Sequence, residues 1–101
     1  MAPETKPPAK EVQLQVQLDE EMAQGIYVNL TMVNHNETEF TLDFIYLQPQ
    51  QPRAKVRARI ISSPKHTKRL LMALKDNIDK YEKKWGEIDI SGPGPADDMM
   101  H

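Results

Sequence analysis

The chain of 101 residues contains no cysteine, and this absence removes several kinds of structure and chemistry at once. Disulfide bonds, thiolate zinc sites and cysteine nucleophiles all require the thiol group. Long apolar runs are also missing: no window approaches the roughly 18 to 20 apolar residues of a membrane-spanning helix. The first ten residues lack the apolar stretch of a signal peptide. We therefore expect a cytoplasmic protein without membrane contacts.

Catalytic and cofactor-binding motifs are absent as well. The three histidines, His35, His66 and His101, are scattered, and no HExxH pair occurs. A glycine-rich phosphate loop and a GxSxG turn are also missing. The sequence thus predicts no enzyme activity, no metal or other cofactor, and no small-molecule substrate.

The two ends of the chain differ in composition from its middle. Three prolines lie within the first eight residues, and the last eleven combine glycine, proline and acidic residues without periodicity. Such composition is typical of disordered segments. We predict a disordered N-terminal tail at residues 1–10, a single α+β domain at 11–90, and a disordered acidic C-terminal tail at 91–101.

Alternation of apolar and polar residues predicts four strands in the domain, because successive side chains of a strand point to opposite faces. The predicted strands are Val12–Leu18, Ile26–Asn34, Thr38–Leu47 and Arg53–Ile61. Asp19–Gln24 suits a turn or a short helical piece that ends at Gly25. Short links favour an antiparallel meander. The pattern leaves open whether Glu87–Ile90 adds a fifth strand.

A long helix is predicted after the last strand. Ser63 can accept a hydrogen bond from an exposed amide at the helix start, and Pro64 suits the first helical position. Gly86 supplies the end. Apolar residues recur between them at intervals of three and four, at Leu71, Leu74, Ile78, Tyr81 and Trp85. The predicted fold is α+β: a four-stranded antiparallel meander followed by one long C-terminal helix packed on one face of the sheet (ββββα).

The face of the predicted sheet opposite the helix carries a second group of apolar residues. These odd-numbered positions are Tyr27, Val33, Ile45, Leu47 and Ile61. A monomer would leave such a patch in water, which is unusual for a protein of this size. The pattern therefore predicts a homo-oligomer, a dimer or a larger assembly, with these five residues at its interface.

Charge is strongly segregated along the chain although the net charge is only −2. The segment from Glu11 to Pro52 holds seven acids and no lysine or arginine, whereas Arg53 to Lys75 holds eight basic residues and no acid. The basic residues of the last strand alternate with apolar ones, which would place them side by side on one face. Seven basic residues form the candidate site: Arg53, Lys55, Arg57, Arg59, Lys65, Lys68 and Arg69.

Two interpretations of these basic residues remain open. In the first interpretation, the basic residues protect an edge strand against unwanted pairing, assisted by cross-strand acids such as Glu39 or Asp43. Alternatively, they bind an anionic partner, because basic residues at a helix start are unfavourable unless an anion compensates them. Aromatic residues for base stacking are missing from Arg53–Lys75, which weighs against recognition of nucleic-acid bases.

Several segments together resemble domain-of-unknown-function family 3467. They are Gly25–His35, Glu39–Phe44, Val56–Ile60, Ser63–Leu71, Asn77–Ile78 and Tyr81–Glu82. The resemblance implies a small stand-alone bacterial or archaeal protein of a family without an established activity, and it transfers no functional residues. The family pattern often has an acid at the position of Lys65. A more distant architectural likeness is to the export chaperone SecB, which has four antiparallel strands followed by a helix and assembles through its sheets.

Three functions follow from these patterns. The leading hypothesis is a non-enzymatic homo-oligomeric interaction protein that uses the basic residues to engage an acidic partner. The alternative is a nucleic-acid-binding protein that contacts phosphates through the last strand and the helix start. The third is a chaperone that holds client proteins on exposed apolar sheet surface.

Overall fold

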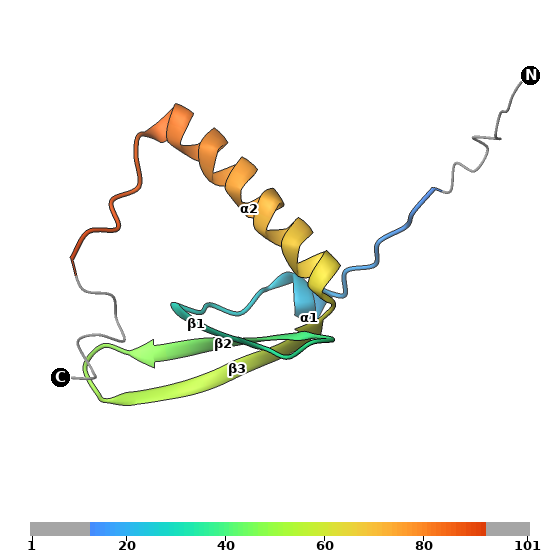
Figure 1. Ribbon diagram of the computed structural model, residues 1–101. Helices are drawn as coiled ribbons and strands as arrows, with labels where there is room; N and C mark the ends of the chain where they lie inside the picture. Colours follow the sequence, from blue (N-terminus) through green and yellow to red (C-terminus); the bar gives the residue numbers. More distant parts are fainter. Residues whose placement is uncertain (1–12, 93–101) are drawn as a thin grey trace, which may run out of the picture.

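The computed structural model describes residues 13–92, which form a three-stranded sheet and two helices (Figure 1). A short helix, α1 (Glu20–Ala23), precedes strands β1 (Leu30–His35), β2 (Phe40–Gln48) and β3 (Arg53–Ser62). The long helix α2 (Pro64–Trp85) follows directly. The predicted α+β class, the antiparallel sheet and the C-terminal helix are confirmed. The predicted tails at 1–10 and, from residue 93, at 91–101 lie outside the described residues.

The prediction of a fourth strand at the N-terminal end was wrong for the single chain. Residues 13–18 are extended, but they join no ladder and run away from the sheet (Figure 1). Alternation along a segment shows that it could have one apolar face, yet a strand also needs a neighbour for its backbone groups. Glu87–Ile90 is likewise not a strand, and the amide of Ile88 instead donates to the Glu82 carboxylate at 2.9 Å.

The sheet is a meander in the order β1-β2-β3, so that β2 is central and the other two strands are edges. The β1–β2 turn is held by Asn36, whose Oδ1 accepts from the amides of Thr38 and Glu39 at 2.9 and 3.0 Å. Before β1, the side-chain amide of Asn29 makes two hydrogen bonds to the backbone of Leu47, as a peptide group of a paired strand would. Its Oδ1 accepts from the Leu47 amide at 2.8 Å, and its Nδ2 donates to the Leu47 carbonyl at 3.0 Å.

The residues that share a face of the sheet are not the odd-numbered and even-numbered sets that the alternation predicts. Met32 lies opposite Asp43 and Val33 lies opposite Leu42, so odd positions of β1 share a face with even positions of β2. The four-residue turn between His35 and Phe40 causes this change, because turn length fixes which residues become partners. We name the two sides the Ile45 face and the Leu42 face.

A bulge changes the faces a second time along β3. Ala58 lies opposite Phe44, but Val56 lies opposite Ile45, which leaves Arg57 as the extra residue. Lys55 consequently pairs with Tyr46 on the Leu42 face, while Arg59 pairs with Asp43 on the Ile45 face. The prediction that the basic residues of this strand project from one face was therefore wrong.

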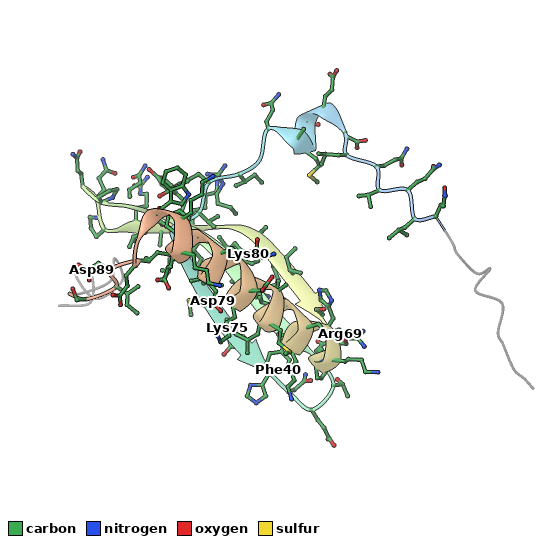
Figure 2. The ribbon with its side chains drawn as sticks, turned by 90° about the horizontal axis from the view of Figure 1, so that it is seen from above. Phe40, Arg69, Lys75, Asp79, Lys80 and Asp89 are labelled. Atoms are coloured by element: carbon green, nitrogen blue, oxygen red, sulfur yellow. The ribbon has the colours of Figure 1, made fainter. Side chains whose placement is uncertain are left out.

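Both predicted ends of the long helix are confirmed. The Ser63 Oγ accepts from the amide of His66 at 3.0 Å, and Pro64 occupies the first helical turn. Gly86 ends the helix with φ at 103°, a left-handed conformation that glycine adopts without steric cost. Two exposed ion pairs, Lys75 with Asp79 and Lys80 with Asp76, link successive turns of the helix. Figure 2 labels Lys75, Asp79 and Lys80 along α2.

The predicted packing of this helix on the sheet is not present in the single chain. α2 starts at the end of β3 and rises from the sheet at an angle (Figure 1), and none of its residues is buried. Thr67 and Leu70, near its start, and Glu82, near its end, are half-buried, and its other residues are exposed. Periodicity indicates that a helix has an apolar side, but it does not show which surface covers that side.

The core of the described chain is very small. Among its apolar side chains only Leu42, Ile45 and Leu47 are buried, and all three belong to β2. A three-stranded sheet needs a packed face or a covering helix for independent stability. Most of the apolar surface that would provide this packing is still exposed.

Candidate interaction surfaces

The apolar side of α2 is exposed to solvent along the length of the helix. We call Leu71, Leu74, Ile78, Tyr81 and Trp85 the helix stripe. Their exposed fractions range from 44% at Ile78 to 66% at Trp85. Tyr81 and Trp85 contact each other with ring centroids 6.5 Å apart, and Lys84 lies over the Trp85 ring at 5.2 Å. Exposed apolar patches are more frequent at sites of protein association than elsewhere on protein surfaces.

The predicted interface residues do not form one patch. Ile45 and Leu47 are buried within the chain, at 4% and 5% exposure. Ile61 is exposed and pairs with Thr41 on the Ile45 face, whereas Val33 is exposed on the Leu42 face. Tyr27 precedes β1, and its ring meets Tyr46 edge-on at 6.2 Å. The structure therefore leaves Tyr27, Val33 and Ile61 available on the surface but separates them.

Arg59 already has a partner in its own chain. Its Nε donates to Asp43 Oδ1 at 2.7 Å and its Nη2 donates to Asp43 Oδ2 at 2.9 Å, a two-point contact across neighbouring strands. Asp43 is buried, and the paired guanidinium of Arg59 compensates the negative charge of its carboxylate. The hydrogen bonds from Arg59 lower the pKa of the Asp43 carboxyl despite its partial loss of water. The expected cross-strand pairing with Asp43 is confirmed, and Arg59 is the one residue of the seven that already pairs with a carboxylate within residues 13–92.

Three other basic residues of β3 share a shallow hollow with residues of β2. Arg53, Lys55 and Arg57 line it together with Tyr46 and Gln48, and we call it the basic hollow. Within residues 13–92, none of the three basic side chains forms an ion pair with a carboxylate. Tyr46 is the aromatic neighbour that the sequence of β3 lacks, and the register against Lys55 supplies it.

The basic residues at the start of α2 form a separate group. Lys65, Lys68 and Arg69 are exposed in the first turns of the helix. Arg69 lies at the same end of the molecule as Phe40 (Figure 2), because Phe40 pairs with the last residue of β3. The basic hollow lies toward the other end of β2, about 15 to 25 Å away at about 3.3 Å per residue. The seven candidate residues therefore do not make one continuous site.

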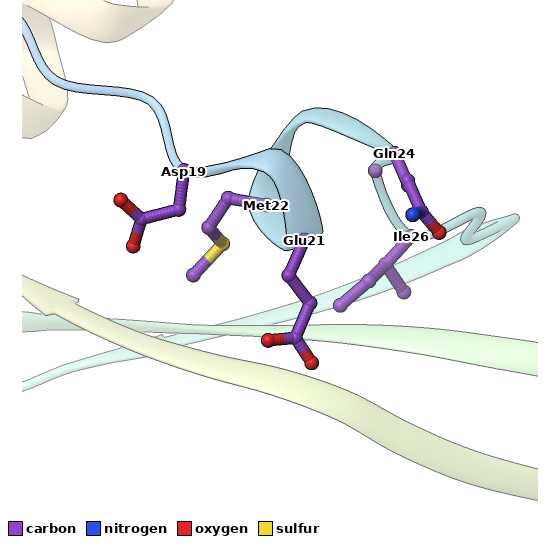
Figure 3. A pocket seen from close by; sticks show the side chains of 6 residues that line it. Asp19, Glu21, Met22, Gln24 and Ile26 are labelled. Atoms are coloured by element: carbon purple, nitrogen blue, oxygen red, sulfur yellow. The ribbon is translucent and has the colours of Figure 1, made fainter.

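An open hollow beside α1 is a surface that the sequence did not reveal (Figure 3). Met22 and Ile26 line it with exposed apolar side chains, and Asp19 and Glu21 add two carboxylates. The turn that ends α1 brings these residues together, with Gly25 at φ 78° and its amide bonded to the Met22 carbonyl. No periodicity in so short a helix could have indicated this arrangement.

Across residues 13–92, no three histidine or acidic side chains are grouped closely enough to hold a metal ion. Neither helix of that part of the chain combines the length and hydropathy that crossing a membrane requires.

These features describe an α+β chain of one antiparallel meander and one amphipathic helix, in which more of the large apolar side chains of residues 13–92 are exposed than buried. The chain belongs to the family described as "Protein of unknown function (DUF3467)", which it matches over residues 1–90. No curated protein matches the sequence, and no solved structure matches the fold.

Proposed function

We propose that this protein is a non-enzymatic homo-oligomeric interaction protein whose basic hollow engages an acidic partner. The observation that carries the proposal is the exposure of the helix stripe and of most apolar residues of the sheet. Only three apolar side chains of the described chain are buried. Burying apolar surface is the main favourable contribution to folding and association, so a surface of this kind is most stable when another chain covers it.

The distribution of charge along the chain favours a second copy of the same chain as the partner that covers the exposed apolar surface. The segment from Glu11 to Pro52 holds seven acids and no lysine or arginine, and the segment from Arg53 to Lys75 holds eight lysines and arginines and no acid. A two-fold symmetric pair can place each segment of one copy against the opposite segment of the other. The net charge of −2 also adds little repulsion between copies.

Light scattering on the purified protein tests the proposed assembly. At tens of micromolar we expect a mass of at least twice the 11.6 kDa of one chain. The measurement is repeated after nuclease treatment, so that bound nucleic acid cannot account for the added mass. A single-chain mass at this concentration would contradict the proposal.

Single-stranded nucleic acid is the second candidate partner, and the position of Tyr46 favours it. Aromatic rings beside basic side chains can stack on bases while the charges contact phosphates. Tyr46 lies in the basic hollow, and the Tyr27 ring contacts it. This combination answers the objection that the basic segment itself contains no aromatic residue.

A filter-binding experiment with single-stranded oligonucleotides tests this second function. Three phosphate contacts, from Arg53, Lys55 and Arg57, should give a slope of about −2 for log affinity against log salt concentration. Reversing charge with Lys55→Glu and Arg57→Glu should abolish retention, whereas Lys65→Glu with Lys68→Glu at the distant helix start should leave it. A salt-independent signal, or equal loss in both variants, would contradict binding at the basic hollow.

A further inference from the structure

We propose that residues 13–18 of one copy add as a strand to the exposed edge of β1 in a second copy. This inference rests on the proposed homo-oligomer and specifies how its subunits join. The segment is already extended, and Leu14, Val16 and Leu18 alternate with Gln13, Gln15 and Gln17. Leu14 and Val16 are each 82% exposed. Within the described chain, the backbone of these six residues makes no hydrogen bond.

The two edges of the sheet are not equally suited to receive a strand. β3 carries Arg53, Lys55, Arg57 and Arg59, and charged residues of this kind discourage pairing at an edge. β1 has the sequence LTMVNH, with no lysine, arginine or acid. Its Met32 and Val33 are both about half exposed, on opposite faces. β1 is therefore the open edge, and it has six residues, the same number as the segment.

The course of the chain directs this segment toward another copy. α1 separates it from β1, and the backbone turns at Gly25 with φ 78°. Amides of Gln24 and Gly25 close the turn by donating to the carbonyls of Glu21 and Met22 at 3.3 and 3.1 Å. Both overall views show the segment running away from its own sheet (Figures 1 and 2). A two-fold pair would exchange the segment reciprocally, as in domain swapping.

This exchange explains why the sequence predicts four strands while one chain forms three. The alternation from Val12 to Leu18 is typical of a strand, and a strand needs the free edge of a sheet to pair with. The β1 edge of the second copy provides it. Each sheet then gains the predicted first strand. Such pairing combines backbone hydrogen bonds with burial of alternate side chains, as in other cases of strand addition.

Proline substitution tests the inference directly. Gln15→Pro with Val16→Pro removes two neighbouring amide donors, so that one of them faces β1 in either register. The matched control, Gln15→Thr with Val16→Thr, changes the same side chains but keeps both donors. Because the segment makes no backbone hydrogen bond with any residue of 13–92, neither change removes one from that part of the subunit. The proline variant should raise the dissociation constant at least about 100-fold, and the threonine variant far less, because ladder bonds are lost in both exchanged strands.

Cross-linking provides a measurement that does not depend on the stability of the assembly. Since the chain has no cysteine, Val16→Cys copies can be mixed with Val33→Cys copies and treated with a short thiol-reactive cross-linker. We expect a covalent pair between these two variants and none between Val16→Cys and Met72→Cys, because Met72 is an exposed residue of α2 outside the helix stripe and far from β1 in sequence. An oligomer that survives the prolines and gives no Val16–Val33 product overturns this inference but leaves the proposed function standing. A wild-type protein that is monomeric overturns both.

Discussion

Leu74→Asp in α2 should convert the assembled protein into single chains at concentrations where Met72→Asp leaves the assembly intact. Both substitutions replace an exposed apolar side chain of the same helix with the same charged one. Leu74 is 52% exposed and Met72 is 64% exposed. Residues two positions apart lie on opposite sides of a helix of 3.6 residues per turn. Only Leu74 belongs to the helix stripe.

The expected size of this effect follows from the burial of one leucine in each copy. Fully burying a leucine side chain contributes about 1.5 to 3 kcal/mol, and because Leu74 is 52% exposed, covering it in both copies of a two-fold pair contributes about 1.5 to 3 kcal/mol in total. A loss of about 3 kcal/mol corresponds to at least a 100-fold higher dissociation constant, and an unpaired buried carboxylate would add to it.

Sedimentation equilibrium over a range of concentrations measures both dissociation constants. Circular dichroism of each variant at high concentration confirms that α2 is still formed. Equal dissociation of the two variants would mean that added charge, and not the helix stripe, drives the change. Unchanged assembly in both would place the contact elsewhere and would contradict a role for the stripe.

Local signals in the sequence predicted the parts of the fold that depend on neighbouring residues. Ser63 and Pro64 specify the helix start because an amide acceptor and a fixed φ angle act within one turn. Gly86 specifies its end, and Gly25 specifies the end of α1, because both adopt positive φ angles. Each of these predictions is confirmed, since none depends on what packs against the element.

Features that depend on pairing between distant residues were not predictable in the same way. The faces of β1 and β2 depend on the length of the turn after His35, and those of β3 depend on the extra residue Arg57. The residue type at the bulge does not predict it, because arginine fits a regular strand as well as a bulge. The predicted patch and the predicted row of basic residues both assumed unbroken alternation, and both were divided by these two features.

The candidate site shows the same division between local and distant information. The basic character of Arg53 and Lys55 was visible in the sequence, but the position of Tyr46 beside them follows only from the register. The pairing of Arg59 with Asp43 could be suggested as a cross-strand contact and is confirmed by the structure. The exposure of the helix stripe could not be predicted, because an apolar side of a helix does not identify the surface that covers it.

Ile45→Asp should prevent folding of the subunit and not merely dissociate the assembly. The sequence alone places Ile45 on an outer patch, where a charged substitution would separate intact subunits. In the structure Ile45 is 4% exposed and is one of the three apolar side chains that are buried among residues 13–92. Removing a buried isoleucine costs about 2 to 5 kcal/mol, and burying an unpaired charge in its place costs more.

Far-ultraviolet circular dichroism and urea unfolding distinguish the two outcomes. Total stabilities of small domains are about 5 to 15 kcal/mol, and a core of three side chains places this subunit at the lower end. We expect Ile45→Asp to show no cooperative unfolding transition at any protein concentration. Leu74→Asp should regain its fold and its assembly as the concentration rises, because its defect lies in an interface.

The conservative change Ile45→Val keeps this prediction testable even if the aspartate variant cannot be purified. Loss of one methylene from a packed site should lower the free energy of unfolding by about 0.5 to 1.5 kcal/mol. The same change at the exposed Ile61 should have an effect close to zero on the subunit. If instead Ile45→Asp gave a folded monomer, Ile45 would face a partner chain, and the interface would include the face of the sheet that the single chain now buries.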